Sequence, residues 1–185
     1  MHEPNSTVSN PVTPLNFACD QSRLVLRDGI ALKVRAITPE DAAKLLDLYH
    51  RLSPRSLYHR FFTIPKPDPA YAAYLADVDS ETHFALVAEF DEEIVAVARY
   101  HRTEAAGCAE AAFTVADAWQ GRGIGPLMLE RLAQVALLHH IKSFEADLLT
   151  DNQQMMKVLS RSRFEMKHQF VAGVYHISLS LAPSA

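Results

Sequence analysis

The sequence predicts an α/β fold in which helices flank one mixed sheet. Runs with the two-residue alternation of strands and runs with the spacing of helices follow one another along the chain. Hydrophobic residues make up 49% of the 185 residues, which is enough for the core of a single domain. A glycine-rich stretch at 120–125 joins a strand-like run to a helix-like run. We therefore expect one domain over residues 23–185, preceded by a flexible tail at 1–22.

The N-terminal part of the chain is expected to pass from this tail into a strand and three helices. Residues 1–22 contain three prolines and little periodicity, which is typical of a flexible segment. After a turn at 27–29, residues 31–37 alternate as a strand does. Thr38 and Pro39 are suited to the N-cap and the first position of a helix that continues to Leu52. Further helices are expected at 54–62 and 68–78.

The remaining part of the chain is richer in strands. Strands at 83–90 and 94–103 are expected to flank an acidic turn at 91–93. After these, a strand at 109–115, a helix at 127–140, a strand at 143–149 and a helix at 152–161 are expected. A final antiparallel pair is expected at 164–170 and 174–181, turning near Gly173. The chain shows no internal repeat.

Composition argues against several classes of function. The net charge of −4 makes a nucleic-acid partner unexpected. Cys19 and Cys108 have no metal-binding or redox spacing, so no metal site is expected and a reducing cytoplasm fits. The chain lacks a run of about 18 apolar residues and the basic-then-apolar pattern of a signal peptide, so no membrane association is expected.

The glycine-rich stretch is the strongest functional signal. The amides of Arg122, Gly123, Ile124 and Gly125 are expected at a helix N-terminus, where free donors and the helix dipole favour a phosphate or pyrophosphate. Pro126 suits the first helical turn because it lacks an N–H. The spacing Gly-x-Gly-x-Gly differs from the nicotinamide fingerprint, and the Gly-Lys-Ser/Thr ending of a nucleotide triphosphate loop is absent. The alternative is a turn that binds no ligand.

Three segments resemble a known family. Gln120-Gly121-Arg122-Gly123-Ile124-Gly125 after a strand resembles the acyl-CoA pyrophosphate loop of GNAT N-acetyltransferases. Residues 52–62, Leu-Ser-Pro-Arg-Ser-Leu-Tyr-His-Arg-Phe-Phe, resemble the bacterial Pat-type protein lysine acetyltransferases, as do 97–100 and 109–117. The resemblance covers about 24–181. It implies the GNAT fold, with a mostly antiparallel twisted sheet, and acetyl-CoA as cosubstrate. It also implies a protein lysine as acceptor, such as a lysine of an acyl-CoA synthetase.

The resemblance also implies roles for individual residues. The loop would hold the pyrophosphate, and it consists of Gly121, Arg122, Gly123, Ile124, Gly125 and Pro126. Main-chain groups of Phe113 and Val115 would pair with the pantetheine arm, and an amide near Val115 would stabilise the oxyanion. Asn152 would contact the arm, or is simply a helix N-cap. Leu159 occupies the position where many GNAT enzymes carry a tyrosine acid, so no general acid is assigned.

Glu110 matches the strand glutamate proposed as general base in the Pat-type enzymes. An alkylammonium acceptor has a pKa near 10.4 and must lose a proton before it attacks. The alternative is a solvated glutamate on an exposed strand face. Among the neighbouring residues, Phe61 and Phe62 are expected to pack in the core, and Arg60 to pair with an acidic group.

Three functions remain open at this point. The first is acetyl transfer from acetyl-CoA to a protein lysine, with Glu110 as base. The second is transfer to a small amine or amino acid. The third is a non-catalytic domain that senses acetyl-CoA, which the missing tyrosine leaves open.

Overall fold

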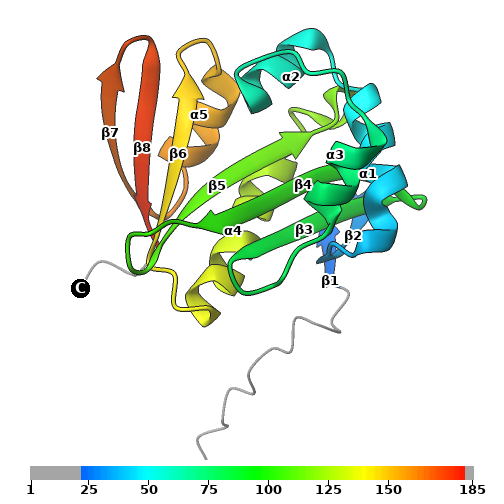
Figure 1. The fold of residues 1–185 in the computed structure, drawn as a ribbon, viewed down its shortest axis with the longest axis horizontal. Coiled ribbons are helices and arrows are strands. Elements are labelled where there is room, and N and C mark those ends of the chain that lie inside the picture. The colour runs from blue at the N-terminus through cyan, green and yellow to red at the C-terminus, as the bar shows by residue number, and fades with distance from the viewer. Residues whose placement is uncertain (1–21, 182–185) are drawn as a thin grey trace, which may run out of the picture.

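The computed structural model describes residues 22–181, which form one eight-stranded sheet with helices on both faces (Figure 1). The strand order is β1-β2-β3-β4-β5-β6-β8-β7, and only β5 and β6 pair in parallel. The strands are β1 (Ser22–Val25), β2 (Ala31–Ala36), β3 (His83–Phe90), β4 (Glu93–Arg102), β5 (Cys108–Val115), β6 (Ser143–Leu149), β7 (Glu165–Val171) and β8 (Val174–Ser180). The helices are α1 (Ala42–His50), α2 (Pro54–Phe61), α3 (Pro69–Ala76), α4 (Ile124–Leu138) and α5 (Gln153–Ser160), with short 3-10 turns η1 (Pro39–Asp41) and η2 (Asp117–Trp119). The predicted α/β fold with a mostly antiparallel mixed sheet is confirmed.

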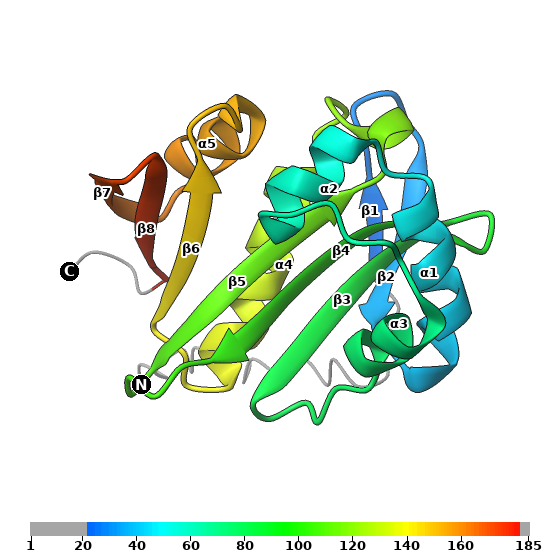
Figure 2. The same cartoon turned by 45° about the horizontal axis from the view of Figure 1, so that its top comes forward.

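Both faces of the central strands are buried, which gives the molecule two apolar layers. Along β3, Phe84, Leu86 and Ala88 belong to the core packed on α4, whereas Ala85 and Val87 belong to the core beneath α1–α3. Figure 2 shows α1, α2 and α3 on one face of the sheet and α4 behind it. Successive residues of a strand point to opposite faces, so β3 serves both layers.

One strand was not expected, and one long helix begins earlier than expected. The strand β1 was not predicted, because it has only four residues and buries only Leu24. The helix α4 begins at Ile124, three residues before the expected start, because Gly123 adopts the left-handed conformation that caps it. The tail expected for residues 1–22 lies outside the described residues, apart from Ser22 in β1. No helix among residues 22–181 combines the length and apolar character needed to span a bilayer.

The sheet separates between β5 and β6. These strands pair only from Cys108 to Glu110 on β5 with residues 143–145 on β6. Beyond this point β5 continues beside β4, while β6 continues beside β8. The two strands diverge in both ribbon views (Figures 1 and 2). One edge of the later part of β5 is therefore left without a neighbouring strand.

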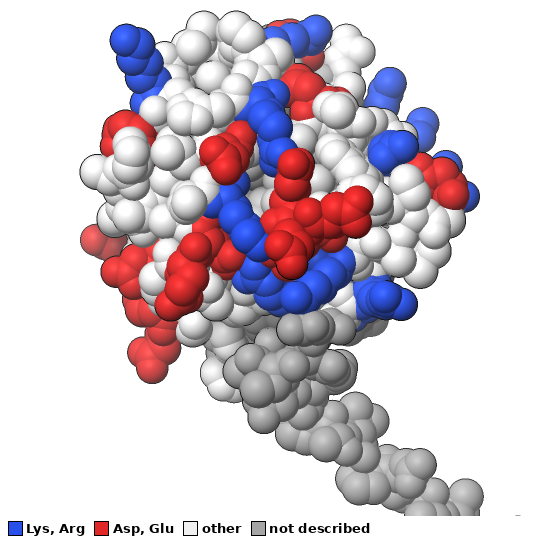
Figure 3. Space-filling model, turned by 90° about the vertical axis from the view of Figure 1, so that its right-hand side faces the viewer, with Lys and Arg blue, Asp and Glu red and all other residues white. Residues whose placement is uncertain are grey.

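An ion network joins β2, η1, α1 and β3. The Arg35 guanidinium donates to Asp41 Oδ2 at 2.6 Å and to Glu89 Oε1 at 2.6 Å, and Lys44 Nζ lies 3.0 Å from the same Glu89 oxygen. Asp41 and Glu89 are only 4% and 6% exposed. The molecular face that carries α1 shows basic and acidic side chains interleaved (Figure 3). Neighbouring opposite charges thus compensate the burial of both carboxylates.

Candidate active site

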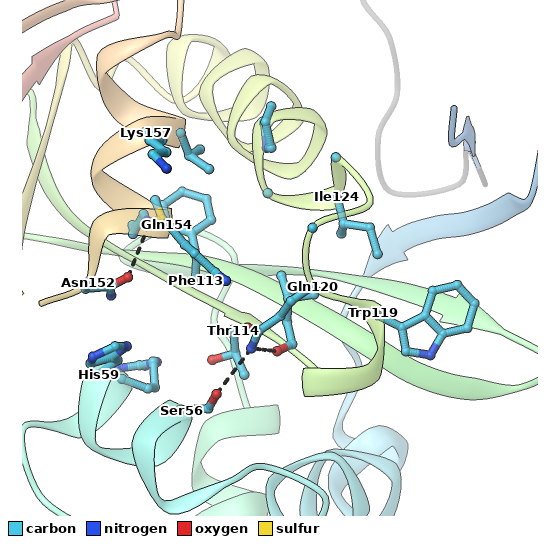
Figure 4. A pocket seen from close by; sticks show the side chains of 18 residues that line it. Ser56, His59, Phe113, Thr114, Trp119, Gln120, Ile124, Asn152, Gln154 and Lys157 are labelled. Atoms are coloured by element: carbon cyan, nitrogen blue, oxygen red, sulfur yellow. Dashed lines mark hydrogen bonds between the residues drawn. The ribbon is translucent and has the colours of Figure 1, made fainter. Parts of the chain in front are cut away.

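A cavity of about 340 Å³ lies where β5 and β6 separate (Figure 4). It is bounded by α2, the end of β5, the glycine loop with the start of α4, and α5. The residues that line it are Ser56, His59, Arg60, Phe113, Thr114, Val115, Trp119, Gln120, Gly121, Gly123, Ile124, Gly125, Pro126, Asn152, Gln154, Met155, Lys157 and Val158. All of the predicted cofactor-binding residues are in this set except Arg122.

The glycines of the loop serve two different structural needs. Gly121 and Gly123 have φ of 76° and 90°, and a Cβ on either would meet no atom within 4 Å. Their backbone conformation favours glycine, and their surroundings stay open for a ligand. Gly125 instead allows close packing, because a Cβ there would lie 3.3 Å from Val158 Cγ2 on α5.

The main chain of the loop offers hydrogen-bond donors. Among residues 22–181, the amides of 121–125 have no acceptor. Gly123 is the N-cap of the 15-residue helix α4, and Pro126 in its first turn has no N–H. Free donors at the positive end of a helix are suited to an anion.

The Arg122 side chain is engaged outside the cavity. Its guanidinium carbon lies 4.7 Å from the centre of the Trp119 ring, and its Nη2 lies 3.4 Å from Asp28 Oδ2. The guanidinium therefore connects the glycine loop to the β1–β2 turn. Only the main chain of Arg122 is positioned to take part in the predicted loop site.

The free edge of β5 presents main-chain groups of Phe113 and Val115. The Ala116 amide donates to Val95 O at 2.9 Å, and hydrogen bonding alternates along an antiparallel pair. Main-chain groups of Phe113 and Val115 consequently point away from β4. The Val115 carbonyl accepts a 3.1 Å hydrogen bond from Gln120 Nε2, drawn in Figure 4.

Asn152 and Leu159 have clear structural roles. Asn152 Oδ1 accepts a hydrogen bond from the Met155 amide at 3.2 Å, so Asn152 caps α5, and it also lines the cavity. Leu159 is 3% exposed and belongs to the core packed on α4. The structure therefore places an apolar packing side chain where a tyrosine acid was considered.

The segment 52–62 is held against the site by Asp117. The Asp117 carboxylate accepts hydrogen bonds from the Ser53 amide and hydroxyl and from the Ser56 hydroxyl, at 2.8 to 2.9 Å. Burial alone would raise the pKa of Asp117, but these hydrogen bonds from Ser53 and Ser56 outweigh it and lower the pKa below its ordinary value. Asp117 thus ties α2 to the segment that follows β5.

The expectations for the end of α2 are partly wrong. Phe61 packs edge-on against Tyr49, with ring centroids 5.5 Å apart, as expected of a core residue. Phe62 is 39% exposed, because it ends α2 with a left-handed φ of 58°. Arg60 has no acidic partner within 4.0 Å in the part of the chain that the structure describes, and it lies over the Phe61 ring at 4.7 Å.

Several polar residues of the cavity were missed by sequence reasoning. Ser56 and His59 come from α2, whereas Gln154 and Lys157 come from α5 (Figure 4). His59 Nε2 lies 3.0 Å from Asp151 Oδ2, which brings α2 beside the turn before α5. The one signal available was the spacing of Gln154 and Lys157, which puts them on the same side of a helix.

Glu110 lines a second, smaller cavity of about 200 Å³. In the strand register Glu110 lies directly opposite His101 on β4, which in turn lies opposite His83 on β3. The two imidazole rings stack at 4.2 Å. Arg60 lines both cavities, so the predicted base and the predicted cofactor site are adjacent but distinct.

Comparisons with known proteins agree with this architecture. The model of the acetyltransferase (GNAT) family matches residues 51–163. Acetyltransferase Pat of Mycolicibacterium smegmatis is 36% identical over 139 residues, which are 74% of this chain and 42% of that protein. Acetyltransferase PA5475 of Pseudomonas aeruginosa is 32% identical over 116 residues, which are 60% of this chain and 62% of that protein. The chain thus spans less than two thirds of the length of either relative.

A solved structure extends the match over most of the chain. The GNAT domain of S. lividans PAT superimposes with a TM-score of 0.82 at 32% sequence identity. The alignment covers 91% of this chain and 99% of that domain. The similarity therefore extends over nearly the whole of that domain.

Proposed function

Because the chain belongs to the GNAT family of acetyltransferases, which use acetyl-CoA, we propose that it acetylates the side-chain amine of a protein lysine. The observation that carries this proposal is the adjacency of two cavities. One combines the glycine loop with the free edge of β5, and the other contains Glu110. A thioester in the first cavity and an amine in the second would meet beside β5.

In this proposal the cofactor is held mainly by backbone. The amides of 121–125 would bind the pyrophosphate, since these donors have no acceptor among residues 22–181. Main-chain groups of Phe113 would pair with the pantetheine arm as an added strand does. Val115 would supply the amide that stabilises the oxyanion, while its carbonyl stays bonded to Gln120. Asn152 would remain the cap of α5 at the rim of the cavity.

The chemistry requires a neutral amine. Glu110 would take the proton of the ammonium, directly or through one water molecule. The amine nitrogen would then attack the thioester carbonyl, forming a C–N bond, and the C–S bond would break as the tetrahedral intermediate collapses. The nitrogen would lose its second proton as the intermediate collapses, and the departing thiolate would gain a proton through water, since Leu159 has no acidic group and a thiol with a pKa near 8.5 is a fair leaving group.

The Pat-type segment 52–62 favours a protein lysine as the acceptor. The cytoplasm is the compartment that fits such a partner. The small volume of the cavity with Glu110 favours a second candidate, a free amine or amino acid. Either acceptor would present a primary amine to the same carboxylate.

Thiol release from acetyl-CoA tests the function directly. The acceptor panel should contain small amines, amino acids, lysine peptides and acyl-CoA synthetases, with mass spectrometry to locate the acetyl group. Turnover with a lysine-bearing protein is the expected result. Binding of acetyl-CoA by calorimetry without thiol release from any acceptor would contradict enzymatic function and favour a sensing domain.

A further inference from the structure

Two arginines line the cavity that contains Glu110. Arg60 comes from the end of α2 and Arg99 from β4. An Arg99 Nη2 donates to the Leu75 carbonyl, and Arg60 lies over the ring of Phe61. Within residues 22–181, neither guanidinium has a carboxylate within 4.0 Å. The cavity therefore contains two cations that form no ion pair with a described side chain, although the carboxylates of Asp77 and Glu110 also line it.

The lack of a counterion matters most for Arg99, because this side chain is partly buried. Burial lowers the pKa of Arg99 below its ordinary value, and the positive charge of Arg60 lowers it further. By contrast, the half-buried Arg35 is matched by two carboxylates at 2.6 Å. Charges removed from water are costly unless they are paired. An anion that enters this cavity would therefore be stabilised by pairing with the two guanidinium groups.

The strand register places a carboxylate near these cations without pairing it to them. Arg99 lies opposite Ala112 and His101 lies opposite Glu110, so Arg99 and Glu110 are diagonal neighbours on the same face. Such positions have Cα atoms roughly 7–8 Å apart. The methyl side chain of Ala112 leaves the space beside Arg99 open, and the cavity of about 200 Å³ has room for about six water molecules.

We infer that this cavity accepts an amine that carries a carboxylate a few atoms away, with Arg60 and Arg99 binding the carboxylate while Glu110 faces the amine. Guanidinium groups bind carboxylates through two parallel hydrogen bonds, which fixes orientation as well as charge. The inference rests on the proposed function and names the acceptor class of the same site. The carboxylate has two possible sources, a free amino acid or an acidic residue beside a protein lysine.

Matched acceptors test the inference and separate these sources. For free amino acids, lysine is compared with 1,5-diaminopentane and tyrosine with tyramine, since each pair differs by one carboxylate. For proteins, lysine peptides with a neighbouring glutamate are compared with peptides in which glutamine replaces it. In the amino-acid series, the peptide series or both, we expect kcat/KM to be at least about tenfold higher for the acceptor that carries the carboxylate. A charge-assisted hydrogen bond would give a difference of this size.

Variants of the two arginines test whether they cause the preference for acceptors that carry a carboxylate. Arg60→Gln and Arg99→Gln should raise KM for the acidic acceptor about tenfold more than KM for the neutral acceptor, and should change kcat little. Arg99→Lys should restore part of the preference. Arg23→Gln on β1 makes the same charge change at an exposed position away from both cavities and serves as the control. If Arg99→Gln does not fold, Arg60→Gln and the matched acceptors still test whether the cavity binds a carboxylate.

Two results overturn the inference in distinguishable ways. Turnover with equal kcat/KM for acidic and neutral members in both series would refute the carboxylate site alone. No turnover with any amine would refute the proposed function, and the inference would be refuted with it.

Discussion

At the scale of single residues, β5 uses its two faces for two tasks. Glu110 and Ala112 face the cavity on the α3 side, whereas Ala109 and Ala111 belong to the core packed on α4. The same strand offers main-chain groups of Phe113 to the other cavity. The proposed base and the proposed cofactor edge lie on one short strand, which gives them the fixed separation that acetyl transfer would require.

Replacing Glu110 by glutamine tests its role as base. Glu110→Gln keeps the size of the side chain but removes the basic carboxylate, so kcat should fall about 10²–10⁴-fold while the affinity for acetyl-CoA changes little. Thiol release from pH 6 to 9 and calorimetry measure the two quantities.

Glu104→Gln controls this experiment, because it makes the same charge change in the exposed loop before β5. Rates for Glu110→Gln equal to those of the wild type at every pH would exclude the base assignment. Catalysis would then depend on the orientation of the amine toward the thioester and on the backbone amide that stabilises the oxyanion.

Leu159 is expected to matter for stability and not for chemistry. Because it is 3% exposed in the main core, Leu159→Ala should lower the free energy of unfolding by about 2–4 kcal/mol. Thermal unfolding measures this loss, and turnover should persist well below the melting temperature. An unchanged melting temperature together with lost turnover would contradict the packing role.

At the scale of elements, the glycine loop and helix α4 form one unit. The left-handed Gly123 allows α4 to begin close to the cavity, and Gly125 lets α5 pack against its first turn. The N-terminus of α4 and the cap of α5 consequently line the same space. The proposed pyrophosphate site thus depends on helix packing as well as on free amides.

A pair of glycine substitutions separates ligand contact from backbone strain. Gly123→Val should weaken acetyl-CoA binding tenfold or more, because its side chain would occupy the open space beside the loop. Gly173→Val is the matched control, since Gly173 has a similar φ of 88° with equally open surroundings, in the β7–β8 turn. Both variants should lose about 1–2 kcal/mol of stability from the left-handed conformation.

Calorimetry and thermal unfolding of both proteins give the comparison. Equal acetyl-CoA affinity in Gly123→Val and wild type would remove the loop from the binding site. Equal loss of affinity in both variants would attribute the effect to strain.

Most elements could be predicted from the sequence because their signals are local. Alternation revealed β2, strand-like apolar runs revealed β3 to β8, and prolines marked the starts of η1 and α2. The short β1 was missed because its single inward leucine gives no periodic signal. The second cavity was missed because it depends on strand register, which aligns His83, His101 and Glu110 from distant segments.

At the scale of the whole molecule, the Arg35 network joins the first part of the chain to the central sheet. Arg35 on β2 binds Asp41 in η1 and Glu89 on β3, so it positions the start of α1 against the sheet. Tyr49 of α1 contacts Phe61 of α2, which contacts Tyr71 of α3. The helices that cover the cavity with Glu110 are thereby connected to this buried ion group.

Removing Arg35 should strongly destabilise the protein at neutral pH. Arg35→Gln leaves Asp41 and Glu89 buried without their main partner, which typically costs about 3–5 kcal/mol. Arg163→Gln is the control, because it breaks an exposed pair with Glu130 and should cost no more than about 1 kcal/mol. Equal melting temperatures for the two variants would show that the buried network contributes little.

The effect should depend on pH in a definite direction. Burial alone would raise the pKa values of Asp41 and Glu89, but Arg35, together with Thr38 at Asp41 and Lys44 at Glu89, outweighs it and lowers both pKa values below their ordinary values. A carboxyl whose pKa is lower in the folded state stabilises the protein above its unfolded pKa of about 4, and this stabilisation is lost as the pH falls through the folded pKa. Thermal unfolding from pH 7 to 3 should therefore show the gap between wild type and Arg35→Gln narrowing below about pH 4. A gap that stays constant down to pH 3 would mean that packing of the Arg35 side chain, and not its charge, stabilises this part of the molecule.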